Sequence, residues 1–191
     1  MRQYTILVDM DDTLENLSEV WVYELNKRHG LSVKPSDITE WDMKKFYPTL
    51  TPDEIYAPLH DRRLWDAIRP LPGAQEAVKR LQSDGHDVVV VTSAHPDTIK
   101  LKYDWLEWFF PNIKYNDIVC CTRKQLVWGD FLVDDGPHNL FGGVYTPIMF
   151  TANHNKNWEP KNLGEYRCYR SDTWDDVVEL IEFLANSKER K

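Results

Sequence analysis

The chain has 191 residues, 42% of them hydrophobic and 28% charged, which suits one globular domain with a full core and room for an inserted subdomain. Its formal net charge of −8 argues against duplex nucleic acid as a partner, because duplexes require a basic face, but leaves a small anionic substrate open. No apolar run approaches the roughly 20 residues of a membrane span, none has the pattern of a signal peptide, and the three cysteines form no disulfide framework, so we expect a cytoplasmic protein.

Five short apolar runs are predicted to form β-strands. The clearest is HDVVVVTSA, where four consecutive valines indicate a strand covered on both faces, as in a parallel sheet. Pro147 in the last run favours an edge strand or a strand start. The five runs are residues 5–9, 86–94, 116–121, 130–135 and 145–151.

Amphipathic segments between these runs predict helices. One begins after Pro72 and Gly73 and repeats apolar residues at i, i+3, i+4 and i+7, namely Ala74, Ala77, Val78 and Leu81. A second runs from a cap at Asp97 to a stop at Pro111, and the last begins near residues 171–172. Alternation of strand and helix is typical of a doubly wound α/β sheet.

Residues 15–69 interrupt this alternation, because they contain no convincing strand. They begin with an amphipathic helix that ends at Gly30 and continue through several prolines and aromatic residues. Ligands bind at the carboxyl ends of the strands in open α/β sheets, so an insertion that leaves from that end would cover the site. We therefore predict a core of residues 1–14 and 70–191 and a small helical cap of residues 15–69.

Several polar residues follow the predicted strands and should meet at one edge of the sheet. They are Asp9, Asp11 and Thr13 after the first strand, Thr92 and Ser93 after the second, Lys124 past the third, and Asp134 and Asp135 at the end of the fourth. Clustered carboxylates repel one another and resist burial unless they are compensated. Mg²⁺ takes oxygen ligands from one or two carboxylates together with substrate phosphate, so the pattern predicts a magnesium-dependent phosphoryl-transfer site.

This constellation resembles the haloacid dehalogenase-like (HAD) phosphohydrolase superfamily, whose motifs occur here in order. A closer resemblance is to the 5′(3′)-deoxyribonucleotidases within it, carried by LVDMDDTL, PLPGAQEAVKRL, VVVVTSA, YDWLEWFF, LVDDGP and IMFTANHN. The resemblance covers the core almost end to end and is weak across residues 15–69. It implies a three-layer core with a mainly parallel five-stranded sheet and a cap inserted after the first strand.

The resemblance also implies roles for the motif residues. Asp9 would be the nucleophile and form an aspartyl-phosphate, and Asp11 would be the general acid and base. Thr92, Ser93 and Lys124 would hold the phosphate. Mg²⁺ would be bound by Asp9, by the backbone carbonyl of Asp11 and by the acidic pair, Asp134 and Asp135.

Two assignments within the motifs stay open. Lys124 competes with Arg123 and Lys102, and we favour Lys124 because it shortly precedes GDFLVDD. In the acidic pair we favour Asp135 as the direct ligand, with Asp134 in or next to the coordination sphere. Asp130 cannot share that metal, since at about 3.3 Å per residue it lies roughly 13 Å from Asp134 along the strand.

The expected substrate is a deoxynucleoside monophosphate with a pyrimidine base. The base would contact residues of the cap, for which the candidates are Leu17, Trp41, Phe46, Tyr47 and Trp65. Stacking on an aromatic ring can contribute about 1–3 kcal/mol, although aromatic residues at helical spacing more often belong to the core. Leu17 stands where the family usually has an aromatic residue, which leaves the base preference open.

Other functions remain as alternatives. A HAD phosphatase or phosphotransferase could act on another small phosphorylated metabolite or on a polynucleotide end with the same nucleophile. A nucleotide-binding pseudo-phosphatase would be expected to lack Asp9, Asp11 or Lys124, and all three are present. A dehalogenase would not need an acid/base at Asp11. A homodimer is left open.

Overall fold

A computed structural model describes residues 3–159 and 167–188 of the chain. Its centre is a parallel sheet in the order β3-β2-β1-β4-β5-β6. The strands are β1 (Thr5–Val8), β2 (Asp87–Thr92), β3 (Ile118–Cys120), β4 (Phe131–Asp134), β5 (Thr146–Phe150) and β6 (Tyr169–Ser171). The α/β fold class is confirmed, but the described sheet has six strands where five were predicted.

Strand β6 was missed because it is short and carries no apolar run. Its three residues, Tyr-Arg-Ser, pair with β5 at the edge of the sheet. Ser171 therefore belongs to a strand, and the last helix, α6 (Trp174–Lys188), begins two to three residues later than predicted. Asp97 likewise does not cap its helix, since α5 (Ile99–Phe109) follows Thr98 and the Asp97 side chain lies beside His95.

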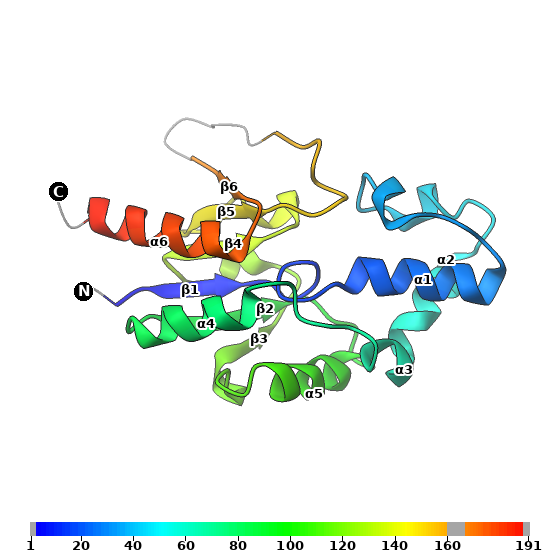
Figure 1. The fold of residues 1–191 in the computed structure, drawn as a ribbon, viewed down its shortest axis with the longest axis horizontal. Helices are drawn as coiled ribbons and strands as arrows, with labels where there is room; N and C mark the ends of the chain where they lie inside the picture. The colour runs from blue at the N-terminus through cyan, green and yellow to red at the C-terminus, as the bar shows by residue number, and fades with distance from the viewer. Residues whose placement is uncertain (1–2, 160–166, 189–191) are drawn as a thin grey trace.

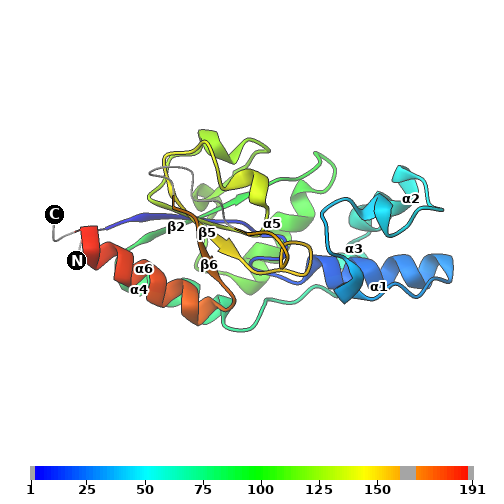
Figure 2. The same cartoon turned by 90° about the horizontal axis from the view of Figure 1, so that it is seen from above.

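Helices α4 (Ala74–Ser83), α5 and α6 pack on one face of the sheet, where their apolar residues share a core cluster with Ile6 and Val8. Figures 1 and 2 show α4 and α6 side by side on that face. The opposite face, which carries Leu7, is covered by residues of the loops around β4, including Leu140 and Tyr145. Alternate side chains of β1 are therefore buried on both faces, as its apolar run predicts.

The helical insertion (residues 15–69) leaves from the carboxyl end of β1 and lies beyond that edge of the sheet (Figure 1). It contains α1 (Leu17–His29), α2 (Pro52–Tyr56) and α3 (Arg62–Trp65). Three short 3₁₀ helices complete it, η1 (Pro35–Asp37), η2 (Met43–Lys45) and η3 (Ala57–His60). Further 3₁₀ turns in the remaining chain are η4 (Tyr115–Asp117), η5 (Lys124–Leu126) and η6 (Pro137–Asn139). Within the ranges that are described, no helix is long and apolar enough to span a bilayer.

Gly129, in the loop before β4, lies tightly against the central strand β1. A Cβ atom at this position would lie 2.6 Å from Cγ of Leu7, a side chain that is fully buried. Gly129→Ala should therefore overpack the core and lower the free energy of unfolding by about 1–3 kcal/mol. Urea denaturation of the two proteins measures this difference, and an unchanged midpoint would contradict the close packing.

Candidate active site

The carboxyl ends of β1, β2 and β4 bring the motif residues together, because these strands are parallel and adjacent. Asp9 follows β1, and its backbone N–H donates to the carbonyl of Val133 in β4 at 2.9 Å. Thr92 ends β2, Asp134 ends β4 and Asp135 follows directly. All four of these polar residues are buried. The predicted meeting of strand-end residues is thus observed in the fold.

Lys124 joins this group from η5 and is almost completely buried. Its Nζ lies 2.6 Å from Oδ1 of Asp9 and 2.7 Å from Oδ2 of Asp134. Burial by itself would lower the pKa of Lys124, but the charges of Asp9 and Asp134 outweigh it and raise that pKa above its ordinary value. The lysine therefore stays charged and offsets the negative charge of the two carboxylates.

The acidic pair differs in how its oxygens are occupied. Oδ1 of Asp134 accepts hydrogen bonds from the Gly136 N–H at 2.8 Å and from Asn139 Nδ2 at 3.0 Å, and its Oδ2 faces Lys124. Oδ2 of Asp135 is buried without a hydrogen-bond partner. Burial, together with the charges of Asp9 and Asp134, raises the pKa of Asp135 well above its usual range. Asp135 is therefore the carboxylate with free coordinating capacity.

These residues fit a divalent cation. Asp9, Asp134 and Asp135 each offer one oxygen, and the three oxygens lie within 4.8 Å of one another. Carboxylate oxygens are the ligands that Mg²⁺ prefers. A bound cation would coordinate the Asp135 oxygen that lacks a hydrogen bond and relieve the repulsion among the three carboxylates.

A second buried lysine, Lys102, reaches the site from α5. Its Nζ lies 2.7 and 2.6 Å from the two carboxylate oxygens of Asp11, 2.7 Å from Oγ1 of Thr92 and 2.8 Å from the carbonyl of Ser93. In the sequence, Lys102 and Lys124 are alternatives for a single role, whereas the fold brings both lysines to the same end of the strands. The sequence held a signal for it, because Lys102 precedes the buried residues Trp105 and Leu106 by three and four positions and so lies on the apolar face of α5.

Of the predicted phosphate-binding residues, Ser93 is the one whose side chain does not contact the site. Its side chain is exposed, and its Oγ donates to the carbonyl of Cys121 at 3.1 Å. Only its backbone carbonyl contacts the site, through Lys102. Asp130 lies at the opposite, amino-terminal end of the strands, where its Oδ2 accepts a hydrogen bond from the N–H of Thr5 at 2.9 Å. The interpretation of Asp130 as a strand-start residue agrees with this contact.

Three further titratable residues border the site and were not assigned a role from the sequence. His154 Nε2 lies 2.7 Å from Oδ2 of Asp135 but is not aligned for a hydrogen bond, and burial lowers the pKa of the imidazole. Asp12 has a positive φ of 51° and its carboxylate accepts from the N–H of Ser18 at 2.9 Å, which fixes the start of α1. Glu15 is fully buried without a hydrogen-bond partner for its carboxyl oxygens.

The burial of Glu15 has a consequence for its charge. Desolvation, followed by the nearby charges of Asp11 and Asp12, raises its pKa well above the ordinary value. The raised pKa favours the neutral form of Glu15, because a charged carboxylate there would be buried beside Asp11 without a hydrogen-bond partner.

The five candidate substrate residues separate into two groups. Leu17 and Trp41 line a small cavity together with Asp11 and His154, and Trp41 is 54% exposed, with its ring centroid 5.0 Å from that of His154 in a T-shaped arrangement. The other three do not line this cavity. They are Phe46, which packs against the core, Tyr47, which is fully buried, and Trp65, whose Nε1 donates to the carbonyl of Leu59 at 2.9 Å.

Comparisons with known proteins agree on one family. Residues 2–188 match the family described as "5' nucleotidase, deoxy (Pyrimidine), cytosolic type C protein". A 5′(3′)-deoxyribonucleotidase from Bacillus subtilis is 35% identical over 174 residues, which cover 90% of this chain and 95% of the relative. One from Clostridium acetobutylicum is 31% identical over 186 residues, which cover 97% of this chain and 99% of that relative.

Solved structures share the fold. The crystal structure of a predicted phosphatase from Clostridium acetobutylicum superposes with a TM-score of 0.66 at 15% identity and covers 94% of this chain and 99% of that one. This likeness concerns the fold alone, since the identity is low.

Proposed function

The chain belongs to this family of deoxy 5′ nucleotidases, and we propose that it is a Mg²⁺-dependent 5′(3′)-deoxyribonucleotidase. It is a phosphomonoester hydrolase of the HAD type, and we infer that it removes phosphate from deoxynucleoside monophosphates, preferably those with a pyrimidine base. The observation that carries the proposal is the pairing of two buried lysines with the two motif aspartates, Lys124 with Asp9 and Lys102 with Asp11. The family description names cytosolic proteins, and we propose a cytoplasmic location for this one.

Asp9 is the proposed nucleophile. One of its carboxylate oxygens would attack phosphorus as the bond from phosphorus to the nucleoside oxygen breaks, which gives an aspartyl-phosphate. Lys124, 2.6 Å from Oδ1, holds the carboxylate in place and offsets negative charge where the phosphate would bind. Mg²⁺, held by Asp9, the Asp11 carbonyl and Asp135 with Asp134 beside them, would neutralise charge on the phosphoryl oxygens.

Asp11 is the proposed general acid and base. In the first step it would give its proton to the departing nucleoside oxygen, and in the second it would take a proton from the water that attacks phosphorus and releases Asp9. Lys102 contacts both oxygens of Asp11 and the hydroxyl of Thr92. It therefore orients the acid/base and places a positive charge beside the expected phosphate position.

Residues 15–69 are the proposed cap over a core of residues 1–14 and 70–191. The cavity lined by Leu17 and Trp41 supports this assignment, because it opens next to Asp11. We propose that the nucleobase enters this cavity and contacts the exposed ring of Trp41, where stacking would contribute about 1–3 kcal/mol. Phe46, Tyr47 and Trp65 serve the packing of the cap instead.

Phosphate release from a substrate panel tests this function. The panel contains deoxyribonucleoside and ribonucleoside monophosphates, sugar phosphates and p-nitrophenyl phosphate, each measured with Mg²⁺ and after removal of divalent cations with EDTA. We expect EDTA to abolish release and excess Mg²⁺ to restore it, with nucleotides as the best substrate class. Faster release from sugar phosphates would contradict the nucleotidase assignment while leaving the phosphatase chemistry intact.

A further inference from the structure

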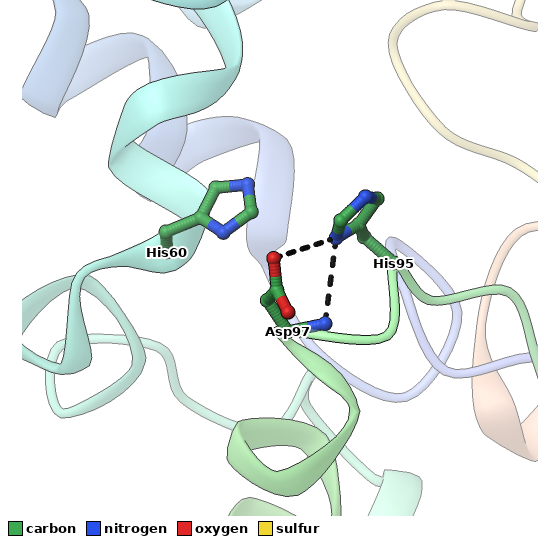
Figure 3. A group of neighbouring side chains, drawn as sticks. All are labelled: His60, His95 and Asp97. Carbon is green, nitrogen blue, oxygen red and sulfur yellow. Dashed lines mark hydrogen bonds and ion pairs between the residues drawn. The ribbon is translucent and has the colours of Figure 1, made fainter.

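A cluster of two histidines and one aspartate lies on the surface, where the helical insertion meets the core (Figure 3). His60 is the last residue of η3 in the insertion, and His95 and Asp97 belong to the loop between β2 and α5. All three side chains are exposed. None of them belongs to the proposed catalytic site.

The three side chains lie close together. The rings of His60 and His95 are 5.5 Å apart between centroids, at an interplanar angle of 65°. Nδ1 of His95 lies 3.4 Å from Oδ2 of Asp97 and accepts a long hydrogen bond, also 3.4 Å, from the Asp97 N–H. Figure 3 shows this nitrogen turned toward Asp97 and His60. An accepting nitrogen carries no proton, so a metal could take its lone pair in place of this long hydrogen bond.

We propose that His60, His95 and Asp97 bind a zinc ion. One donor atom from each residue lies within 4.8 Å of the other two. A tetrahedral zinc site with bonds of about 2.0–2.2 Å brings its ligands to about 3.3–3.6 Å from one another, so small rotations of these exposed side chains close the site. Two imidazoles and one carboxylate, with water in the fourth position, form a ligand set that zinc accepts.

The ligand chemistry distinguishes this site from the acidic cluster. Imidazole nitrogen suits zinc and other late first-row metals, whereas Mg²⁺ prefers oxygen ligands. The acidic cluster offers three carboxylates, with the single imidazole of His154 beside Asp135, whereas the surface cluster offers two imidazoles and only one carboxylate. Zinc should therefore bind the surface cluster in the presence of Mg²⁺.

The position of the cluster gives the ion a structural effect. His60 belongs to the helical insertion, while His95 and Asp97 lie two and four residues after Ser93 in the core. An ion pair between Nη1 of Arg62, two residues after His60, and Oδ2 of Asp104, at 2.9 Å, already joins the same two parts of the chain. Zinc would add a coordination bond across this boundary and hold the insertion against the loop after β2.

Zinc titration of the full chain tests the proposal. The wild-type protein, freed of metal and kept in excess Mg²⁺, is compared with His60→Asn, His95→Asn and Asp97→Asn by calorimetry. His29→Asn is the matched control, because His29 lies in the insertion but outside the cluster. We expect the three cluster variants to bind zinc at this site about 10-fold or more weakly and the control to bind it like the wild type.

Two further readouts distinguish this site from the acidic cluster, which can also bind zinc. Asp135→Asn should weaken zinc binding at the acidic cluster and leave the surface site intact. Co²⁺ bound to the surface site of this variant should show the absorption typical of four-coordination. In that background, zinc should raise the midpoint of thermal unfolding, and His60→Asn should remove the increase. Unchanged zinc binding in His60→Asn or in His95→Asn, with the fold checked by circular dichroism, would overturn the proposal.

Discussion

Replacement of Asp9 by asparagine is expected to lower the rate of phosphate release by about 10⁴-fold or more, which is the scale of loss when a nucleophile is removed. The amide has nearly the same shape as the carboxylate, but its oxygen is a poor nucleophile toward phosphorus. Lys124, 2.6 Å from Oδ1 of Asp9, can still donate to an amide oxygen, so the fold should be preserved. Steady-state phosphate release under saturating Mg²⁺ measures the effect.

The matched control for this variant is Asp130→Asn. Asp130 lies near the same strands, but at their amino-terminal end, where it accepts a hydrogen bond from the Thr5 N–H at 2.9 Å. An asparagine there retains an acceptor oxygen and should leave turnover unchanged. Equal losses in the two variants would indicate a general effect of charge and would contradict the role of Asp9 as nucleophile.

Replacement of Lys102 by methionine is expected to lower kcat/KM by about 10²–10³-fold, as the loss of a charged donor at a transition state does. Methionine fills a similar volume, so the packing of α5 should be retained. The variant leaves both Asp11 oxygens and the Thr92 hydroxyl without their shared partner. Separate values of kcat and KM distinguish a loss of acid/base function, which lowers kcat, from a loss of phosphate binding, which raises KM.

Lys100→Met is the control for this experiment. Lys100 lies two positions earlier on the same helix, its side chain is 80% exposed, and it pairs with Asp104 at 2.7 Å. An exposed ion pair contributes little, so this variant should keep its activity. If Lys102→Met also kept full activity, the buried ammonium would be a structural partner of Asp11 and the proposed role for it would be wrong.

Much of the fold follows from the sequence, because buried parallel strands have a strong pattern. The four valines after Asp87 and the apolar run before Asp9 have no polar face, so they form strands covered on both sides. Once these strands are parallel, their carboxyl ends must share one edge, which brings Asp9, Thr92 and Asp134 together. Short elements such as β6 lack this pattern, since pairing with β5 determines them rather than their own composition.

The contribution of Lys102 was harder to predict, because it depends on how a helix packs. A lysine on an amphipathic helix is usually solvated, and only the rotation of α5 against the sheet turns this one toward Asp11. Its spacing from Trp105 and Leu106 indicated the buried face, and a buried lysine needs an acidic partner. For the helical insertion, the sequence supplied aromatic residues, but burial separates Tyr47 and Trp65 from the cavity that Trp41 lines.

The ratio of kcat/KM for dUMP and UMP decides whether this enzyme acts on deoxynucleoside monophosphates. Both substrates carry the same base and phosphate, so the ratio isolates the effect of the 2′-hydroxyl at the proposed site. We predict a ratio of about 10 or more in favour of dUMP, a difference of about 1.4 kcal/mol in transition-state binding. A ratio at or below one would contradict the assignment as a deoxyribonucleotidase.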